Sequence, residues 1–141
     1  MVIKQLSVFL ENKTGRLMEV LSALGEEKIN IKAITIADTS EFGIMRILVS
    51  HPAEALSLLK ARGFSVSLTD VLAIATPVEA GSFAKALRVL SDRNISIEYM
   101  YGFSIGEKAA IILCAEDIGK ASAALKENGM EMIPAEALNR L

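Results

Sequence analysis

The sequence predicts an α+β protein in which one strand–helix–strand–strand–helix–strand unit is used twice. The first observation behind this fold class is an internal repeat: residues from Leu6 onward match residues from Leu72 onward at a constant offset of 66, without a gap. The second is that alternating and helical apolar patterns follow one another in the same order in both halves. Such self-similarity marks one structural unit used twice.

The matched positions of the repeat are glycines and apolar residues, which build structure. They pair Gly15 with Gly81, Leu21 with Leu87, Leu24 with Leu90, Ile29 and Ile31 with Ile95 and Ile97, Leu59-Lys60 with Leu125-Lys126, and Gly63 with Gly129. The polar residues differ between the halves, and that difference bears on function.

The first half begins with a strand in which Leu6, Val8 and Leu10 alternate with polar residues, and the strand breaks at residues 11–15. A helix with one buried face follows from Arg16 to about residues 27–28. The remaining predicted elements are strands over 29–36 and 44–49 joined by a turn at 38–41, a helix from Pro52 that ends at Gly63, and a strand over 64–68.

The second half repeats this order. Its predicted elements are a strand over 71–76, a loop over 77–81, a helix over 82–93, strands over 95–103 and 109–115, a helix over 118–128 and a strand over 130–133. Each half is thus expected to be a ferredoxin-like unit, an antiparallel four-stranded sheet with both helices on one face. We expect domains at 1–69 and 70–141, with almost no linker and with their sheets side by side.

Composition narrows the class of protein. The chain has 141 residues, 52% of them hydrophobic, and a net charge of -2, which favours a globular protein over a disordered or nucleic-acid-binding one. No apolar run reaches the length of a membrane span, and the first ten residues lack a signal-peptide core, so a cytoplasmic protein is expected. Cys114 is the one cysteine, which excludes an intramolecular disulfide and favours a buried thiol.

Two strands of the second half are apolar on both faces. They are Tyr99-Met100-Tyr101 and the run from Ile111 to Cys114. A sheet with helices on one face only should alternate, so something is expected to cover the far side. A homodimer through the exposed sheet faces is the favoured explanation, and scattered exposed apolar residues on a single chain are the alternative.

The loop after the first strand has the features of an anion site. Gly15 allows a sharp turn, and the N–H groups from about Thr14 to Leu17 open the next helix without internal partners. Asn12 adds a donor and an acceptor beside the loop, and Asn30 adds a second pair at the start of the next strand.

These residues carry a resemblance to a known family. The segment from Leu10 to Leu17, followed by Asn30-Ile31, resembles the ACT domain, the small-molecule-sensing unit of allosteric amino-acid enzymes. The segment from Thr76 to Phe83, with Ser96-Ile97, is similar to a diverged ACT domain. Together the two copies cover essentially the whole chain.

The resemblance implies a regulatory protein with a free amino acid as its ligand, held at the seam between neighbouring ACT domains. The ligand-binding residues that it implies are Asn12, Lys13, Thr14, Gly15, Arg16, Leu17, Asn30 and Ile31 in the first copy, and Val78, Glu79, Ala80, Gly81, Ser82 and Phe83 in the second. Backbone donors near Lys13 to Leu17 would take the carboxylate, and Asn12 would orient the amino group.

The second copy departs from this pattern. Val78 stands where the first copy has Asn12, and Ser96 stands where it has Asn30. We therefore expect fewer working sites than the repeat suggests. The second half would then supply a wall and side-chain pocket, for which Phe83, Tyr99 and Met100 are candidates.

Other roles remain open for several of these residues. Asn12 could close an Asx-turn or cap the helix, and Asn30 could simply follow the helix. His51 and Asp117 occupy matched helix-cap positions, which favours a structural role for this sole histidine. For Arg46, a salt bridge at an edge or dimer interface is favoured over ligand contact.

Three function classes follow. The favoured one is a non-enzymatic amino-acid-binding regulator that changes domain pairing or its contact with an unidentified enzyme or regulator. The alternatives are a structural or interaction module that binds no ligand, and a small hydrolase similar to acylphosphatase. The hydrolase has little support, because the sequence shows no glycine-rich arginine loop for a phosphate, and one histidine, one cysteine and no ligand cluster leave little for a catalytic site. No cofactor, nucleic acid or membrane partner is expected.

Overall fold

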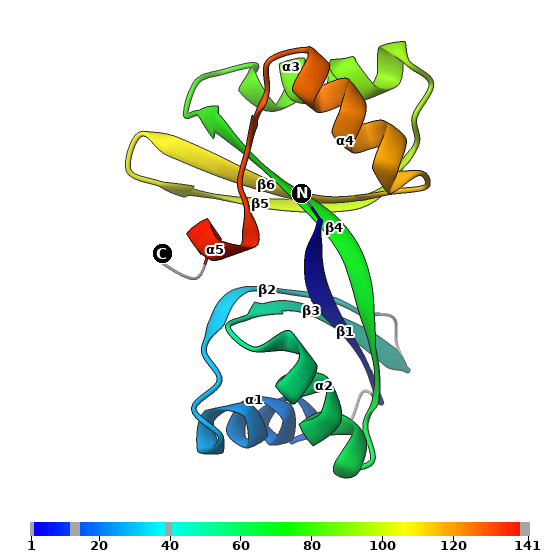
Figure 1. The fold of residues 1–141 in the computed structure, drawn as a ribbon. Helices are drawn as coiled ribbons and strands as arrows, with labels where there is room; N and C mark the ends of the chain where they lie inside the picture. The colour runs from blue at the N-terminus through cyan, green and yellow to red at the C-terminus, as the bar shows by residue number, and fades with distance from the viewer. Residues whose placement is uncertain (1, 12–14, 39–40, 139–141) are drawn as a thin grey trace. The chain divides into compact units, whose positions relative to one another are not determined.

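The structure, a computed structural model, describes residues 2–11, 15–38 and 41–138 (Figure 1). The chain forms two compact units that meet in sequence between Thr69 and Asp70. The first comprises Lys4–Thr69, and the second comprises residues 70–138 together with residues 2–3.

The first unit has a sheet with the strand order β2-β3-β1-β4. Its elements are β1 (Ile3–Glu11), α1 (Arg16–Glu26), β2 (Ile31–Asp38), β3 (Phe42–Val49), α2 (Pro52–Ala61) and the first part of β4 (Ser65–Pro77). Both helices lie on one face of the sheet (Figure 1). Leu6 and Val8 of β1 lie opposite Ile47 and Met45 of β3, and all four are fully buried in the core beneath the helices.

The second unit repeats this topology. It contains the later part of β4, α3 (Ser82–Asp92), β5 (Ile97–Ile105), β6 (Lys108–Ala115), α4 (Ile118–Glu127), β7 (Glu131–Met132) and a short α5 (Ala135–Leu138). β6 and β7 both pair with β4, and β5 pairs with β6. The predicted α+β class with two ferredoxin-like βαββαβ units is therefore confirmed.

The repeat holds at the level of single backbone angles and hydrogen bonds. Gly15 and Gly81 both have left-handed φ values, of 91° and 87°, and each accepts a 2.9 Å bond from the N–H four residues later. Lys28 and Asn94, the next matched pair, have φ values of 57° and 56°. The pairing of β2 with β3 shifts register after Ile31, and that of β5 with β6 shifts after Ile97, at the same offset. The shared glycine and apolar positions thus encode shared geometry.

Several predicted boundaries were wrong. The strands expected over 64–68 and 71–76 form one continuous strand, β4, because Thr69-Asp70 contains neither glycine nor proline to break it. β2 begins at Ile31 instead of Ile29, because the N–H of Ile29 bonds the Leu24 carbonyl at the helix end. The last expected strand shortens to β7, and α5 was not predicted.

β6 has buried side chains on both of its faces. Ile111 and Leu113 of β6 pack into the core of this unit, whereas Ile112 and Cys114 point to the opposite face. Both of these side chains are nonetheless buried. The two-sided apolar pattern of this strand therefore reflects burial on both faces.

The left-handed helix starts give a test of the duplication. Gly15→Ala and Gly81→Ala should each lower the free energy of unfolding by about 1–2 kcal/mol, because an L side chain is strained at positive φ. Gly25→Ala, inside α1 with nothing within 4 Å of the added carbon, should instead raise it by about 0.5–1 kcal/mol. Urea unfolding measures all three, and a neutral effect at Gly15 or Gly81 would contradict the shared geometry.

Candidate ligand-binding site

The first predicted loop is described only in part. Asn12, Lys13 and Thr14 lie outside the described residues. Gly15 is the N-cap of α1, and no side chain caps that helix start among the described residues. Arg16 extends over the Phe64 ring, 4.5 Å from its centroid, and its Nη1 atom lies 2.8 Å from Oε2 of Glu19. Leu17 is exposed. Arg16 is thus held by its own unit, and no direct ligand role follows from its contacts.

Asn30 sits where β2 is about to begin. Its N–H donates to Oγ of Ser50 at 3.0 Å, and its carbonyl accepts from the N–H of Ser50 at 2.9 Å. The residue is exposed, and Ile31 beside it packs partly buried against the core. The backbone of Asn30 thus has a structural role, which leaves its side chain for the role that the resemblance implies.

The helix-cap interpretation of His51 and Asp117 holds for both positions. Asp117 caps α4, with Oδ1 accepting from the N–H of Lys120 at 3.0 Å. His51 occupies the N-cap of α2, and its Nδ1 atom lies 3.0 Å from Oγ of Ser50.

The second predicted loop connects β4 to α3. The N–H of Val78 donates to the Glu107 carbonyl at 3.2 Å, which ties the loop to the β5–β6 turn. Phe83 has a packing role: a carbon added at Gly102 of β5 would lie 3.2 Å and 3.3 Å from two of its ring atoms. Phe83 therefore packs over the glycine but is still 36% exposed, and its place in a ligand pocket stays a prediction.

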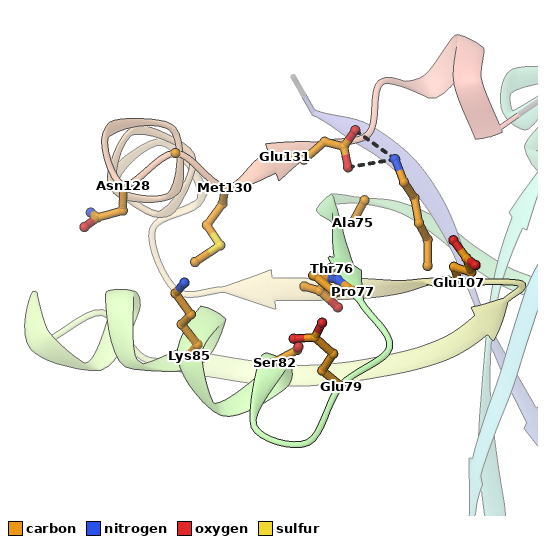
Figure 2. Close-up of a pocket in the computed structure, with 12 residues that line it drawn as sticks. Ala75, Thr76, Pro77, Glu79, Ser82, Lys85, Glu107, Asn128, Met130 and Glu131 are labelled. Carbon is orange, nitrogen blue, oxygen red and sulfur yellow. Dashed lines mark hydrogen bonds and ion pairs between the residues drawn. The ribbon is translucent and has the colours of Figure 1, made fainter.

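A cavity of about 480 Å³ lies in the second unit (Figure 2). Its lining residues come from the end of β4, the loop and first turn of α3, the β5–β6 turn and the segment between α4 and β7. They are Ala75, Thr76, Pro77, Glu79, Ser82, Lys85, Glu107, Lys108, Asn128, Gly129, Met130 and Glu131. This volume is within the range of roughly 300–1,000 Å³ that is usual for small-molecule sites.

The cavity includes only part of the predicted set. Glu79 and Ser82 line it, whereas Val78, Ala80, Gly81 and Phe83 do not. The sequence interpretation missed Thr76 and Lys85. A signal was present: in an otherwise apolar strand, Thr76 stands at the repeat position of Leu10, which is buried in the first core.

Thr76 is the unusual polar group of this cavity. The residue is 5% exposed, and among the described residues Oγ1 has no hydrogen-bond partner. It alternates along β4 with Leu72 and Ile74, so it faces the same side of the sheet as the helices. An unsatisfied buried hydroxyl costs about 1–3 kcal/mol. Such a group in a native structure calls for a partner.

Both signs of charge line the cavity. Lys108 and Glu131 both line it, and Nζ of Lys108 lies 3.3 Å and 3.4 Å from the two carboxylate oxygens of Glu131. Figure 2 marks these contacts at Glu131 with dashed lines. Within residues 2–11, 15–38 and 41–138, Lys85, Glu79 and Glu107 form no ion pair. The first turn of α3 contains no acidic residue and has no side-chain cap. The cavity therefore offers one unpaired cation at a helix start and two unpaired carboxylates.

Among the described residues, no group of three or more histidine, cysteine, aspartate or glutamate side chains could hold a metal ion. In the same part of the chain, no helix is both long and apolar enough to cross a bilayer.

The fold and its loops define a class of protein: paired ferredoxin-like units, each with a glycine-started helix after its first strand. The model of the ACT domain pair matches residues 1–141, and the chain belongs to that family. ACT domain pairs are regulatory folds related to amino-acid-binding regulatory domains, and such domains are non-catalytic.

Solved structures agree with this assignment. A protein from Bacteroides thetaiotaomicron is 42% identical with a TM-score of 0.96, over 100% of this chain and 98% of that one. The ligand-free regulatory subunit of aspartate kinase from Thermus thermophilus is 21% identical with a TM-score of 0.64, over 89% and 92%. The corresponding subunit from Thermus flavus is 18% identical with a TM-score of 0.61, over 88% and 90%. The two aspartate kinase subunits show the shared fold. No curated protein matches the chain.

Proposed function

We propose that this protein is an amino-acid-responsive regulator without catalytic activity of its own. The observation that carries the proposal is the duplicated helix start, in which left-handed Gly15 and Gly81 each open a helix that has no side-chain cap among the described residues. Such a start presents free N–H groups to a carboxylate. Membership of the ACT domain pair family and the fold shared with aspartate kinase regulatory subunits support the same ligand class.

In this proposal the amino acid is held where ACT domains meet. The first-copy residues 12–17, Asn30 and Ile31 contribute the loop and the strand start. The ligand changes how domains pair, or how the protein contacts an enzyme or regulator, because it favours one arrangement over another. We place the protein in the cytoplasm, where free amino acids and their enzymes are found.

Homodimerisation is part of the proposal. β2 is the end strand in the order β2-β3-β1-β4, so its outer edge is available for pairing. Four exposed apolar side chains lie on β2 and the first turn of α1: Leu17, Met18, Ile34 and Ile36. On the opposite face of the first sheet, Phe9 and Phe42 are 51% and 57% exposed. Exposed apolar side chains at a free strand edge favour association with a second copy.

A thermal-shift panel of the twenty amino acids tests the proposal. At 100 times its dissociation constant, one specific amino acid should add about 2.7 kcal/mol to the free energy of unfolding and raise the melting temperature. The same ligand should change the sedimentation coefficient if it alters domain pairing. Asn12→Ala should remove the part of the shift that binding at the first-copy site produces, and Lys28→Ala, an exposed change outside the loop, should preserve all of it.

If none of the twenty amino acids changes the melting temperature of the wild-type protein, the proposed function is wrong. That result would favour the structural or interaction module instead. Turnover of an acyl phosphate would favour the small hydrolase.

A further inference from the structure

We propose that the cavity of the second unit is a separate binding site for a small zwitterion with a carboxylate and an ammonium group, such as a free α-amino acid. This inference rests on the proposed function for the class of ligand. It differs in place, because the site lies inside one unit and uses residues of the second copy alone.

Thr76 has an unmet hydrogen bond in the cavity wall. The residue is 95% buried, its Oγ1 atom has no partner within the part of the chain that the structure describes, and it lies on the helix-facing side of β4. The matched residue, Leu10, is an ordinary core residue of the first unit. A polar ligand atom, or a water that the ligand holds, supplies the partner that the hydroxyl lacks.

The two copies carry different side chains at matched positions around this site. In the first copy, Arg16 extends over Phe64 and pairs with Glu19. The matched residues in the second copy are Ser82, Met130 and Lys85. A short hydroxyl replaces the arginine, and a cation replaces the glutamate, so the second copy loses the arginine that covers this region in the first. Figure 2 shows Lys85 directed toward Met130, with Glu79 and Ser82 beneath Thr76 and Pro77.

Positive and negative charges lie at different ends of the cavity lining. Lys85 lies in the first turn of α3, so its ammonium and the helix start both favour a carboxylate. Glu79 and Glu107 lie in the loop and in the β5–β6 turn, where they favour an ammonium group. Lys108 and Glu131 neutralise each other. A ligand that carries both charges satisfies both ends, whereas a simple anion or cation satisfies one.

Isothermal titration calorimetry with the full chain tests the inference. The probes are the twenty amino acids and, for any that binds, the matching amine without its carboxylate and the matching acid without its amino group. Thr76→Val keeps the shape of the side chain and removes the hydroxyl, and it should weaken binding about tenfold, since that is the effect of roughly 1.4 kcal/mol. Lys85→Gln should weaken binding by at least as much.

Two controls make the result specific. Arg88→Gln removes another exposed cation of α3 that does not line the cavity, and it should leave affinity unchanged. Asn12→Ala tests the first-copy site and should leave this binding intact. Lys85 is exposed, so Lys85→Gln is expected to fold even if Thr76→Val does not.

The outcomes separate the two proposals. Loss of binding in Thr76→Val and Lys85→Gln, with retention in Asn12→Ala, supports the cavity. Loss of binding in Asn12→Ala, with retention in Thr76→Val and Lys85→Gln, overturns the cavity proposal and supports the first-copy site. Two binding events support both sites if Asn12→Ala removes one of them and the cavity variants remove the other. If the amine or the acid alone binds as tightly as the amino acid, the proposal of a zwitterionic ligand is wrong. If no amino acid binds, both proposals are wrong.

Discussion

Leu24→Ala and Leu90→Ala should each lower the free energy of unfolding by about 2–5 kcal/mol, the usual cost of a large cavity in a well-packed core. Both side chains are fully buried, at matched positions of α1 and α3, and each packs between its helix and its own sheet. The carbonyls of both residues also accept 2.9 Å bonds, from Ile29 and Ile95, and these bonds should survive the change. Urea unfolding followed by circular dichroism measures the loss.

Ser22→Ala is the matched control for these two variants. Ser22 lies on α1 but is exposed, so its truncation should change the free energy of unfolding by no more than about 0.5 kcal/mol. A loss below about 1 kcal/mol at Leu24 or Leu90 would contradict the core assignment of that unit.

Gly102→Ile should lower the free energy of unfolding by about 1–3 kcal/mol, because the added side chain overpacks the second unit. A carbon at this position would lie 3.0 Å from the Ala110 carbonyl oxygen and 3.2 Å from the Phe83 ring. The matched residues of the first copy are Leu17, at the position of Phe83, and Ile36, at the position of Gly102.

The double variant Phe83→Leu/Gly102→Ile copies the first-half pair into the second half. It should recover part of the loss, with a coupling energy of about 0.5–3 kcal/mol for residues in contact. Strict additivity of the two single changes would show that the residues do not share one packing site. Ser104→Ala, an exposed change further along β5, should be neutral and serves as the control.

The fold was predictable because it depends on local sequence patterns, and the same patterns occur in both halves of the chain. Gly15 and Gly81 mark the same left-handed helix start, and the alternation of Leu6, Val8 and Leu10 fixes which side of β1 is buried. The ends of helices and strands were less predictable where a backbone hydrogen bond determines them. Ile29 bonds to the end of α1 before β2 begins, and no local signal separates that bond from the start of a strand.

The candidate site was predictable only in part. The loop residues Glu79 and Ser82 follow from the repeat and line the cavity. Phe83, predicted as a pocket wall, packs against Gly102 of β5, and its role in ligand binding stays a prediction. Whether Asn12 and Asn30 bind a ligand stays a prediction, which the thermal-shift panel addresses.

The sequence by itself determined the duplicated architecture, the glycine-started helices and the apolar faces, since each depends on residues close together in the chain. Only the tertiary structure decided that Thr76, Lys85 and Met130 line one cavity. These residues come from β4, α3 and the segment after α4, and their proximity depends on how the strands pair and how the helices cover them. A site built from segments far apart in the sequence depends on tertiary packing, and the local sequence pattern of one segment does not contain that information.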